Sequence, residues 1–289
     1  MNIATTLYRS VLFVPAGEQR QLEKSSTIPA DVLVFDLEDA VSPASKEQAR
    51  KLLIDTLTAT DFNHHQCVVR INGVSTPWFN DDMAALLELN DCAVMLPKFE
   101  SIDDLIKLKQ AQKGQNKQLF GLIETALGVL SIAELVKHLG ADDLLCFGHV
   151  DFARDMGLVK ADASSGAVYY ARCQVALAAH AYRIPAIDNI TLDVKDERII
   201  RKDALEGMQL GFQGKLCIHP NQVSIVNEVY TPTANQVNRA REILEEWEHV
   251  KNQGRSVFTY ENKMVDLPVV LAQKNLLARY AVITKNDDR

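Results

Sequence analysis

The chain has 289 residues, of which 47% are hydrophobic and 24% charged, a balance typical of a globular protein with a full-sized core. Its net charge of −7 argues against a general nucleic-acid binder, because neutralising phosphates needs a basic surface. No apolar run approaches the roughly 18–20 residues that span a bilayer, and the first ten residues lack the layout of a secretory signal.

Eight short apolar runs recur along the chain. They cover residues 9–15, 32–39, 67–72, 92–98, 119–125, 144–151, 184–190 and 214–220. Each is apolar on consecutive residues rather than on alternate ones, which is typical of parallel strands buried on both faces.

Longer stretches with helical periodicity lie between these runs. The clearest are 42–57, 102–112, 126–139, 166–183 and 195–210, the last of which ends at Gly211, a residue suited to a helix C-cap. Eight strand–helix units of roughly 30 residues each fill the usual length of a (β/α)₈ barrel. A doubly wound open sheet is the weaker alternative, because no glycine-rich phosphate loop follows the first strand.

The pattern changes after residue 230. A charged helix is expected over 233–253, then a short segment at 258–263 and a last helix to about Tyr280. These residues exceed what eight units need. We therefore predict a barrel domain over 1–230 and a C-terminal helical extension over 231–289, acting as a lid or packing on a neighbouring subunit.

Polar residues follow several of the predicted strands, at the end of the barrel where such folds carry their chemistry. Glu124 and Asp151 come from adjacent strands, and neighbouring carboxylates repel each other unless a positive group lies between them. Mg²⁺ satisfies both, since it takes one or two carboxylates and keeps several waters. Neutralisation by Arg70 or Lys98, with no metal, is the alternative. Arg70 is also the natural group to stabilise an enolate oxygen.

Zinc is not expected at this site. His149 and His219 have no partner at ligand spacing, and two carboxylates favour a harder ion. The five cysteines are widely spaced without a CxxC pair, which predicts neither a disulfide framework nor a zinc site and favours a reducing, cytoplasmic compartment.

Seven short motifs, in order along nearly the whole chain, resemble the citrate lyase β-subunit-like group of the HpcH/HpaI aldolase family, which includes malyl-CoA and citramalyl-CoA lyases. They are RSVLFVP at 9–15, FDLEDAV at 35–41, VRIN at 69–72, LPK at 96–98, LIET at 122–125, CIHP at 217–220 and MVDLP at 264–268. Gly148 with Asp151 also matches the family. The resemblance implies a Mg²⁺-dependent barrel that makes or breaks a C–C bond between an acyl thioester and a 2-oxo acid, typically as a homotrimer.

The resemblance also assigns roles to single residues. Glu124 and Asp151 match metal ligands, and Arg70 matches a substrate-binding arginine. Glu38 and Asp39 match acidic residues that hold metal-bound waters. Asp266 matches a catalytic aspartate delivered by a neighbouring subunit, although an Asp before Leu-Pro can also simply cap a helix. Arg20 and Lys24 match basic residues that face the CoA phosphates.

The chain departs from the pattern at one position, because Ala16 stands where many members have a glycine after the proline. The histidine at 219 resembles the stand-alone CoA lyases rather than the citrate lyase β chains, which favours a CoA thioester over an acyl carrier protein thioester.

The expected reaction is retro-Claisen cleavage of malyl-CoA or citramalyl-CoA to acetyl-CoA and a 2-oxo acid. Three alternatives remain open: a citrate lyase β chain acting on a citryl-carrier protein, an aldolase for a free hydroxy-oxo acid, and a non-catalytic barrel that only binds a ligand. The retained Glu124, Asp151 and Arg70 argue against the last.

Overall fold

The computed structural model describes residues 7–62 and 64–287. The chain divides into two compact units. The larger spans residues 8–230, and the smaller contains Leu7 and the chain from Thr231 onward.

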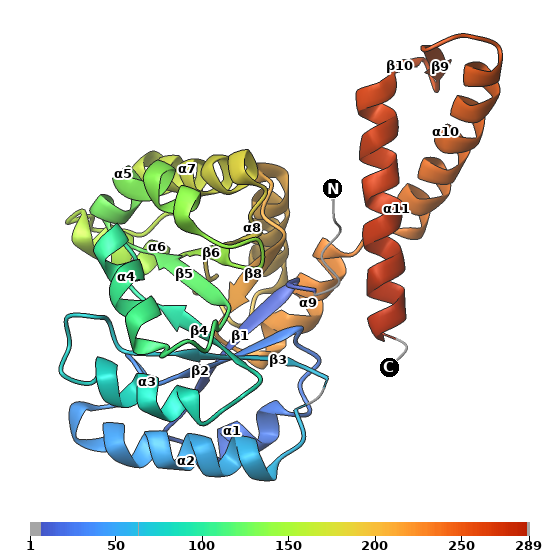
Figure 1. Cartoon of the computed structure of the whole chain (residues 1–289). Coiled ribbons are helices and arrows are strands. Elements are labelled where there is room, and N and C mark those ends of the chain that lie inside the picture. The colour runs from blue at the N-terminus through green and yellow to red at the C-terminus, as the bar shows by residue number, and fades with distance from the viewer. Residues whose placement is uncertain (1–6, 63, 288–289) are drawn as a thin grey trace. The chain divides into compact units, whose positions relative to one another are not determined.

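The larger unit is a closed barrel of eight parallel strands, in which sequence neighbours pair and the eighth strand returns to the first (Figure 1). The strands are β1 (Ser10–Pro15), β2 (Val32–Asp36), β3 (Gln66–Arg70), β4 (Cys92–Leu96), β5 (Leu119–Ile123), β6 (Leu144–Phe147), β7 (Ala186–Asp188) and β8 (Gly214–Cys217). The predicted (β/α)₈ barrel is confirmed.

Helices surround the strands. They are α1 (Gln19–Ser25), α2 (Lys46–Ala59), α3 (Phe79–Leu87), α4 (Ile102–Ala111), α5 (Ala126–Leu135), α6 (His149–Asp155), α7 (Gly166–Tyr182), α8 (Glu197–Leu210) and α9 (Pro220–Tyr230), with 3₁₀ turns at Pro43–Ser45 and Val136–His138. All five helices expected in the barrel are present, and α8 ends at Gly211, whose φ of 101° is left-handed as the C-cap requires. Within the described residues, no helix is long and apolar enough to cross a membrane.

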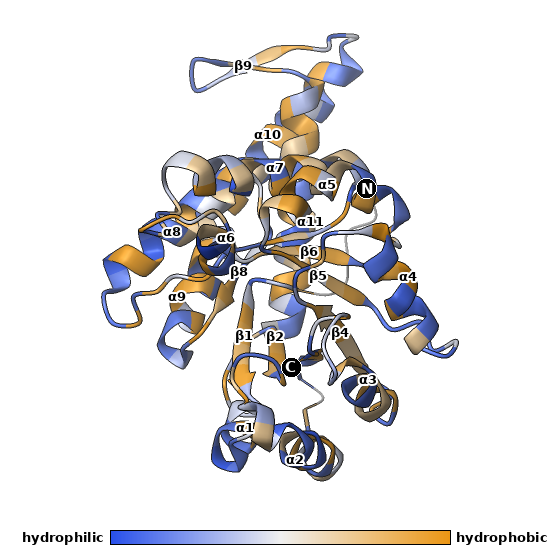
Figure 2. Ribbon diagram, turned by 90° about the vertical axis from the view of Figure 1, so that its left-hand side faces the viewer, coloured by the Kyte–Doolittle hydropathy of each residue, from blue (hydrophilic) through white to orange (hydrophobic). Residues whose placement is uncertain are grey.

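Strand side chains fall into two buried layers, because successive residues of a strand point to opposite faces. One layer fills the barrel and includes Val11, Val34, Val68, Met95 and Phe120. The other packs against the helices and includes Leu12, Phe35, Val69, Val94 and Ile123. Figure 2 shows the result, with strands largely hydrophobic and hydrophilic residues gathered on the helices. Burial on both faces explains why the strands are apolar on consecutive residues.

Seven of the eight strands end two to four residues before the predicted boundary, because the chain leaves the sheet where polar residues begin. One prediction is thereby wrong: Asp151 does not end a strand. It lies in the first turn of α6, the short helix that follows β6.

The smaller unit contains α10 (Ala234–Asn252), a hairpin of β9 (Phe258–Tyr260) and β10 (Lys263–Val265), and α11 (Leu267–Asp287). Thr233 and Gln236 form a capping box at the start of α10. A hydrophobic cluster joins α10 to the hairpin and to the first turns of α11; its members include Ile243, Trp247, Val250, Phe258, Val265 and Val270. The last helix extends to Asp287, beyond the expected end near Tyr280.

Candidate active site

Asp36, Arg70 and Glu124 lie together at the C-terminal end of the barrel because they share its inward-facing positions. Each continues the alternation of buried inner residues on its strand: Asp36 follows Val34, Arg70 follows Val68, and Glu124 follows Leu122. Alternation therefore directs a carboxylate, a guanidinium and a second carboxylate to the mouth of one barrel.

Arg70 is held from two directions. Asp36 is its partner in the β2–β3 register, and the Asp36 carboxylate accepts hydrogen bonds from Arg70 Nε at 2.7 Å and Nη2 at 2.6 Å. The guanidinium also lies over the Phe13 ring, 4.8 Å from its centroid. Such a forked pair fixes the plane of the guanidinium as well as its position.

Asp36 is a site residue that the sequence analysis left without a role. Besides Arg70, it accepts the backbone N–H groups of Glu38 at 2.8 Å and Ala40 at 3.1 Å. It therefore shapes the loop after β2, and this loop carries Glu38.

Glu38 is buried between two cations. Lys98 Nζ lies 2.6 Å from its Oε1, and Arg70 Nη1 lies 3.3 Å from its Oε2. Burial outweighs these cations and raises the pKa of Glu38 above its usual value. Oε2 has no hydrogen bond of acceptable geometry among the described residues, so this buried oxygen can still accept a donor or a bound water. The neighbouring Asp39 is exposed to solvent.

Glu124 follows β5 and is 2% exposed. Its Oε1 accepts the backbone N–H of Lys98 at 2.9 Å, while Lys98 Nζ is 4.0 Å away. Burial raises the pKa of Glu124 to about 8, and the negative charges of Glu38 and Asp151 add to the effect. Arg70 and Lys98 lower it only in part, because both are already engaged with Asp36 or Glu38. The protein's own cations therefore leave this carboxylate under-neutralised.

Two backbone features fit closely around Glu124. A Cβ on Gly148 would lie 2.7 Å from Glu124 Oε2, so only glycine leaves room for the carboxylate there. Lys98 has a φ of 49°, a left-handed conformation that costs free energy in a residue other than glycine. Its hydrogen bonds to Glu124 and Glu38 hold it in place.

Asp151 approaches Glu124 from the first turn of α6, whose N-cap Gly148 is tied to β5 by the hydrogen bond from its N–H to Ile123 O at 2.9 Å. Its only ion pair in the described chain is with Arg154, 2.5 Å from Oδ1, but the contact lacks hydrogen-bond geometry. The Arg154 side chain is 71% exposed, and such surface pairs contribute little. A cation can therefore displace Arg154 from Asp151.

The donor set fits Mg²⁺. Two unsatisfied buried oxygens, Glu38 Oε2 and Asp151 Oδ1, flank the under-neutralised Glu124. In the described ranges no group of three or more His, Cys, Asp or Glu side chains forms a metal cage. Mg²⁺ needs no such cage, because it binds through one or two carboxylates and completes its octahedron with water and substrate oxygens.

The two histidines lie outside this donor set. His149 is buried, contacts Asn189 Nδ2 through Nδ1 at 3.2 Å, and burial lowers its pKa to about 4, so it is neutral. His219 Nδ1 accepts the backbone N–H of Asn221 at the start of α9. The contacts of both histidines are therefore with neighbouring structural groups and not with the carboxylates of the site.

The remaining residues predicted from the sequence lie at separate places. Arg20 and Lys24 are exposed, four residues apart on α1, and therefore share one face of that helix. Asp266 belongs to the smaller unit, where its Oδ1 accepts the backbone N–H of Val269 at 3.4 Å and caps α11. The barrel site by itself thus contains Asp36, Glu38, Arg70, Lys98, Glu124 and Asp151.

A second buried charge cluster is structural. Arg172 on α7 is fully buried and bonds Asp188 through Nε at 2.8 Å and Nη2 at 2.6 Å, while Lys215 on β8 reaches Asp188 at 3.3 Å and Asp203 at 2.7 Å. A Cβ on Gly207 would lie 2.2 Å from Asp188, which shows how closely α8 approaches. The cluster links α7 and α8 to the barrel wall.

Comparison with known proteins gives the family. The HpcH/HpaI aldolase/citrate lyase family matches residues 9–220, and a C–C bond lyase family of the TIM-barrel fold matches residues 173–271. The chain is 32% identical over 277 residues to a (3S)-malyl-CoA thioesterase of Cereibacter sphaeroides, covering 95% of each chain. It is 31% identical over 280 residues to the citrate lyase subunit beta of Leuconostoc mesenteroides, covering 94% of this chain and 92% of that one.

A solved structure agrees. The CitE protein of Mycobacterium tuberculosis, in complex with magnesium, acetoacetate and coenzyme A, superposes with a TM-score of 0.81 at 30% identity, covering 96% of this chain and 99% of that one. The resemblance seen in the seven motifs is thereby confirmed. The chain belongs to the HpcH/HpaI aldolase/citrate lyase family, as a carbon–carbon lyase on a TIM barrel.

Proposed function

We propose that the protein is a Mg²⁺-dependent lyase that cleaves malyl-CoA or citramalyl-CoA to acetyl-CoA and a 2-oxo acid. The observation that carries this proposal is the under-neutralised Glu124, buried beside Asp151 and next to the firmly held Arg70. The magnesium and coenzyme A named for the M. tuberculosis structure and the malyl-CoA named for the C. sphaeroides relative support it.

Glu124 and Asp151 would hold the metal, and Glu38 and Asp39 the water around it. A bound Mg²⁺ supplies a Lewis acid that favours negative charge on the oxygens of the 2-oxo acid half. Lys98 orients this end of the site, since its backbone N–H binds Glu124 and its ammonium binds Glu38.

In cleavage, the C3 hydroxyl gives its proton to a solvent water and its oxygen becomes the carbonyl oxygen of the 2-oxo acid. The C2–C3 bond breaks, and its electron pair stays on C2 as the acetyl-CoA enolate. Arg70 stabilises the negative charge that develops on the thioester oxygen. Asp266 then gives a proton to C2, or removes one in the condensing direction. We assign this Asp266 to a neighbouring subunit of a homotrimer, so that the extension over residues 231–289 completes the site.

Arg20 and Lys24 would bind the phosphates of CoA. Their exposure and shared helix face suit a flexible, multiply charged ligand. A free hydroxy-oxo acid has no such phosphates.

The deciding experiment incubates the purified protein and Mg²⁺ with malyl-CoA, citramalyl-CoA and citryl-CoA, with the Glu124→Gln variant as control. Acetyl-CoA together with glyoxylate or pyruvate is the expected product pair. Free CoA with malate would show thioester hydrolysis instead. No reaction with any of the three, but cleavage of a citryl-carrier protein, would identify a citrate lyase β chain.

A further inference from the structure

Two cysteines lie side by side at the opposite, N-terminal end of the barrel. Cys67 on β3 and Cys92 on β4 are partners in the register of these strands. Neighbouring strands lie about 4.8 Å apart, and disulfides form across Cα separations of about 4.4–6.8 Å. In sequence they are 25 residues apart, a spacing with no motif, so only the pairing of β3 with β4 brings them together.

The two thiols point to the same face of the sheet. Both side chains belong to the outer layer between strands and helices, and both are free thiols with 8% of their surface exposed. The proximity of each thiol shifts the pKa of the other. That pairing makes them unequal: it lowers the pKa of Cys92 and raises that of Cys67.

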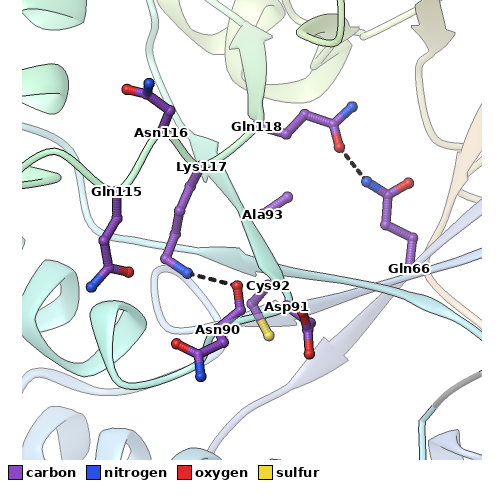
Figure 3. Close-up of a pocket in the computed structure, with 9 residues that line it drawn as sticks. All are labelled: Gln66, Asn90, Asp91, Cys92, Ala93, Gln115, Asn116, Lys117 and Gln118. Atoms are coloured by element: carbon purple, nitrogen blue, oxygen red, sulfur yellow. Dashed lines mark hydrogen bonds between the residues drawn. The ribbon is translucent and has the colours of Figure 1, made fainter.

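Cys92 also opens onto a hollow of about 360 Å³. Apart from Ala93, the other residues that line it are polar and include Gln66, Asn90, Asp91, Gln115, Lys117 and Gln118. Figure 3 shows the Lys117 side chain running toward Asn90 and Cys92. Lys117 Nζ is fixed there by the backbone oxygens of Leu89 at 2.6 Å and Asn90 at 3.3 Å. Its positive charge further lowers the pKa of Cys92, against the effect of burial.

The other cysteines lack this combination. Cys146 and Cys217 have no exposed surface, and burial raises the pKa of each, that of Cys217 to about 12. Cys173 is half-buried on α7. Among the described cysteines, Cys92 alone combines a neighbouring thiol, a fixed cation and access through a hollow.

We propose that Cys92 is a site of reversible oxidation by hydroperoxides and that Cys67 resolves it as an intramolecular disulfide. The Cys92 thiolate attacks one peroxide oxygen, the O–O bond breaks, and the second oxygen leaves with a proton as water or alcohol, giving a sulfenic acid. The sulfur of Cys67 then attacks that of Cys92. The S–S bond forms, the S–O bond breaks, and water leaves with the Cys67 proton. The two sulfurs together lose two electrons to the peroxide, and a thiol reductant later restores both cysteines.

Trypsin offers a direct test on the intact native protein. It cuts after Lys51, Arg70 and Lys98, so the two cysteines fall in separate peptides, 52–70 and 71–98. After brief treatment with hydrogen peroxide and alkylation under denaturing conditions, two of the five thiols should be lost, and the two peptides should appear joined until dithiothreitol is added.

Three variants separate the roles. Cys67→Ser should leave a sulfenic acid on Cys92 that dimedone traps, whereas Cys92→Ser should lose the rapid reaction altogether. Lys117→Met should slow oxidation by about tenfold, through the weaker stabilisation of the thiolate. Cys173→Ser is the matched control and should form the disulfide at the normal rate.

Oxidation of Cys173 before Cys92, or a dimedone adduct on Cys67 rather than Cys92, would overturn the proposal. So would peptides 52–70 and 71–98 that stay separate while Cys92 is over-oxidised. None of these readouts uses the lyase reaction, so the outcome does not depend on the substrate proposed above.

Discussion

Asp36 and Arg70 face each other across β2 and β3 and share two short hydrogen bonds. The pairing of the two strands therefore fixes the orientation of the arginine. Asp36→Asn keeps the size of the side chain but replaces one of the two acceptors with a donor. We expect kcat/KM to fall by about 100-fold, since small misplacements of a catalytic group have effects of this order. Steady-state kinetics of this variant and of Arg70→Ala test this. Normal kinetics of the Asp36→Asn enzyme would show that Arg70 does not need Asp36 for its orientation.

Glu124→Gln should abolish Mg²⁺ binding and change how the stability of the metal-free protein depends on pH. The pKa of Glu124 is raised to about 8 from 4.5, so the folded protein keeps a proton that the unfolded chain loses. Its stabilising contribution is complete below pH 4.5 and is lost as the pH rises to about 8.

Near pH 5 the metal-free variant should match the wild type, and at pH 8 it should be more stable by about 1–3 kcal/mol. Urea unfolding in EDTA measures both values. Added Mg²⁺ should stabilise only the wild type at pH 8. Equal stability of the two proteins at every pH would mean that Glu124 is already neutralised by Arg70 and Lys98.

Gly148→Ala tests the close approach of α6 to Glu124. The new methyl group would lie 2.7 Å from Oε2 and 2.8 Å from Cβ of Glu124, so one of the two groups must move. We expect Mg²⁺ affinity to fall at least about tenfold, as measured by calorimetry. Gly73→Ala is the matched control, because a Cβ there meets no atom within 4 Å. Equal affinity in both variants would place the metal away from Glu124.

Asp266→Asn separates catalysis from helix capping. Asparagine caps a helix about as well as aspartate, so α11 should stay folded while the proton donor is lost. We expect turnover to fall by about 100- to 10,000-fold with little change in KM.

Mixing Asp266→Asn with Glu124→Gln subunits under exchange conditions should restore part of the activity if Asp266 serves a neighbouring barrel. Full activity in a monomer, by gel filtration, would exclude that arrangement.

Arg20→Ala with Lys24→Ala should raise KM for CoA thioesters by about tenfold and leave kcat almost unchanged, because phosphate contacts remote from the reacting carbon act mainly on binding. Lys51→Ala, an exposed charge on α2, is the control. An unchanged KM would point to a substrate without CoA.

The fold could be predicted from the sequence because barrel strands that are buried on both faces have a simple sequence pattern. They consist of consecutive apolar residues, as in Leu119–Ile123. The site was only partly predictable. Glu124 and Arg70 stand at strand ends, where the alternation of side chains along the strand indicates which way each one points. Asp36 escaped assignment because its role depends on facing Arg70 across the sheet, and Asp151 was placed on a strand because Val150 extends the apolar run. The pairing of Cys67 with Cys92 depends in the same way on the register of β3 and β4, which the spacing of the two residues along the chain does not indicate.

The two proposed metal ligands differ in how firmly the fold holds them. Glu124 directly follows β5, a strand that is hydrogen-bonded on both sides, whereas Asp151 stands on α6, a helix of seven residues whose N-cap, Gly148, supplies no side-chain hydrogen bond. Short helices without a side-chain cap are marginal on their own. Cation affinity is therefore linked to the folding of this short helix. Substitutions on the outer face of α6 should change the affinity for the metal without contacting it, and hydrogen exchange there should slow when the ion binds.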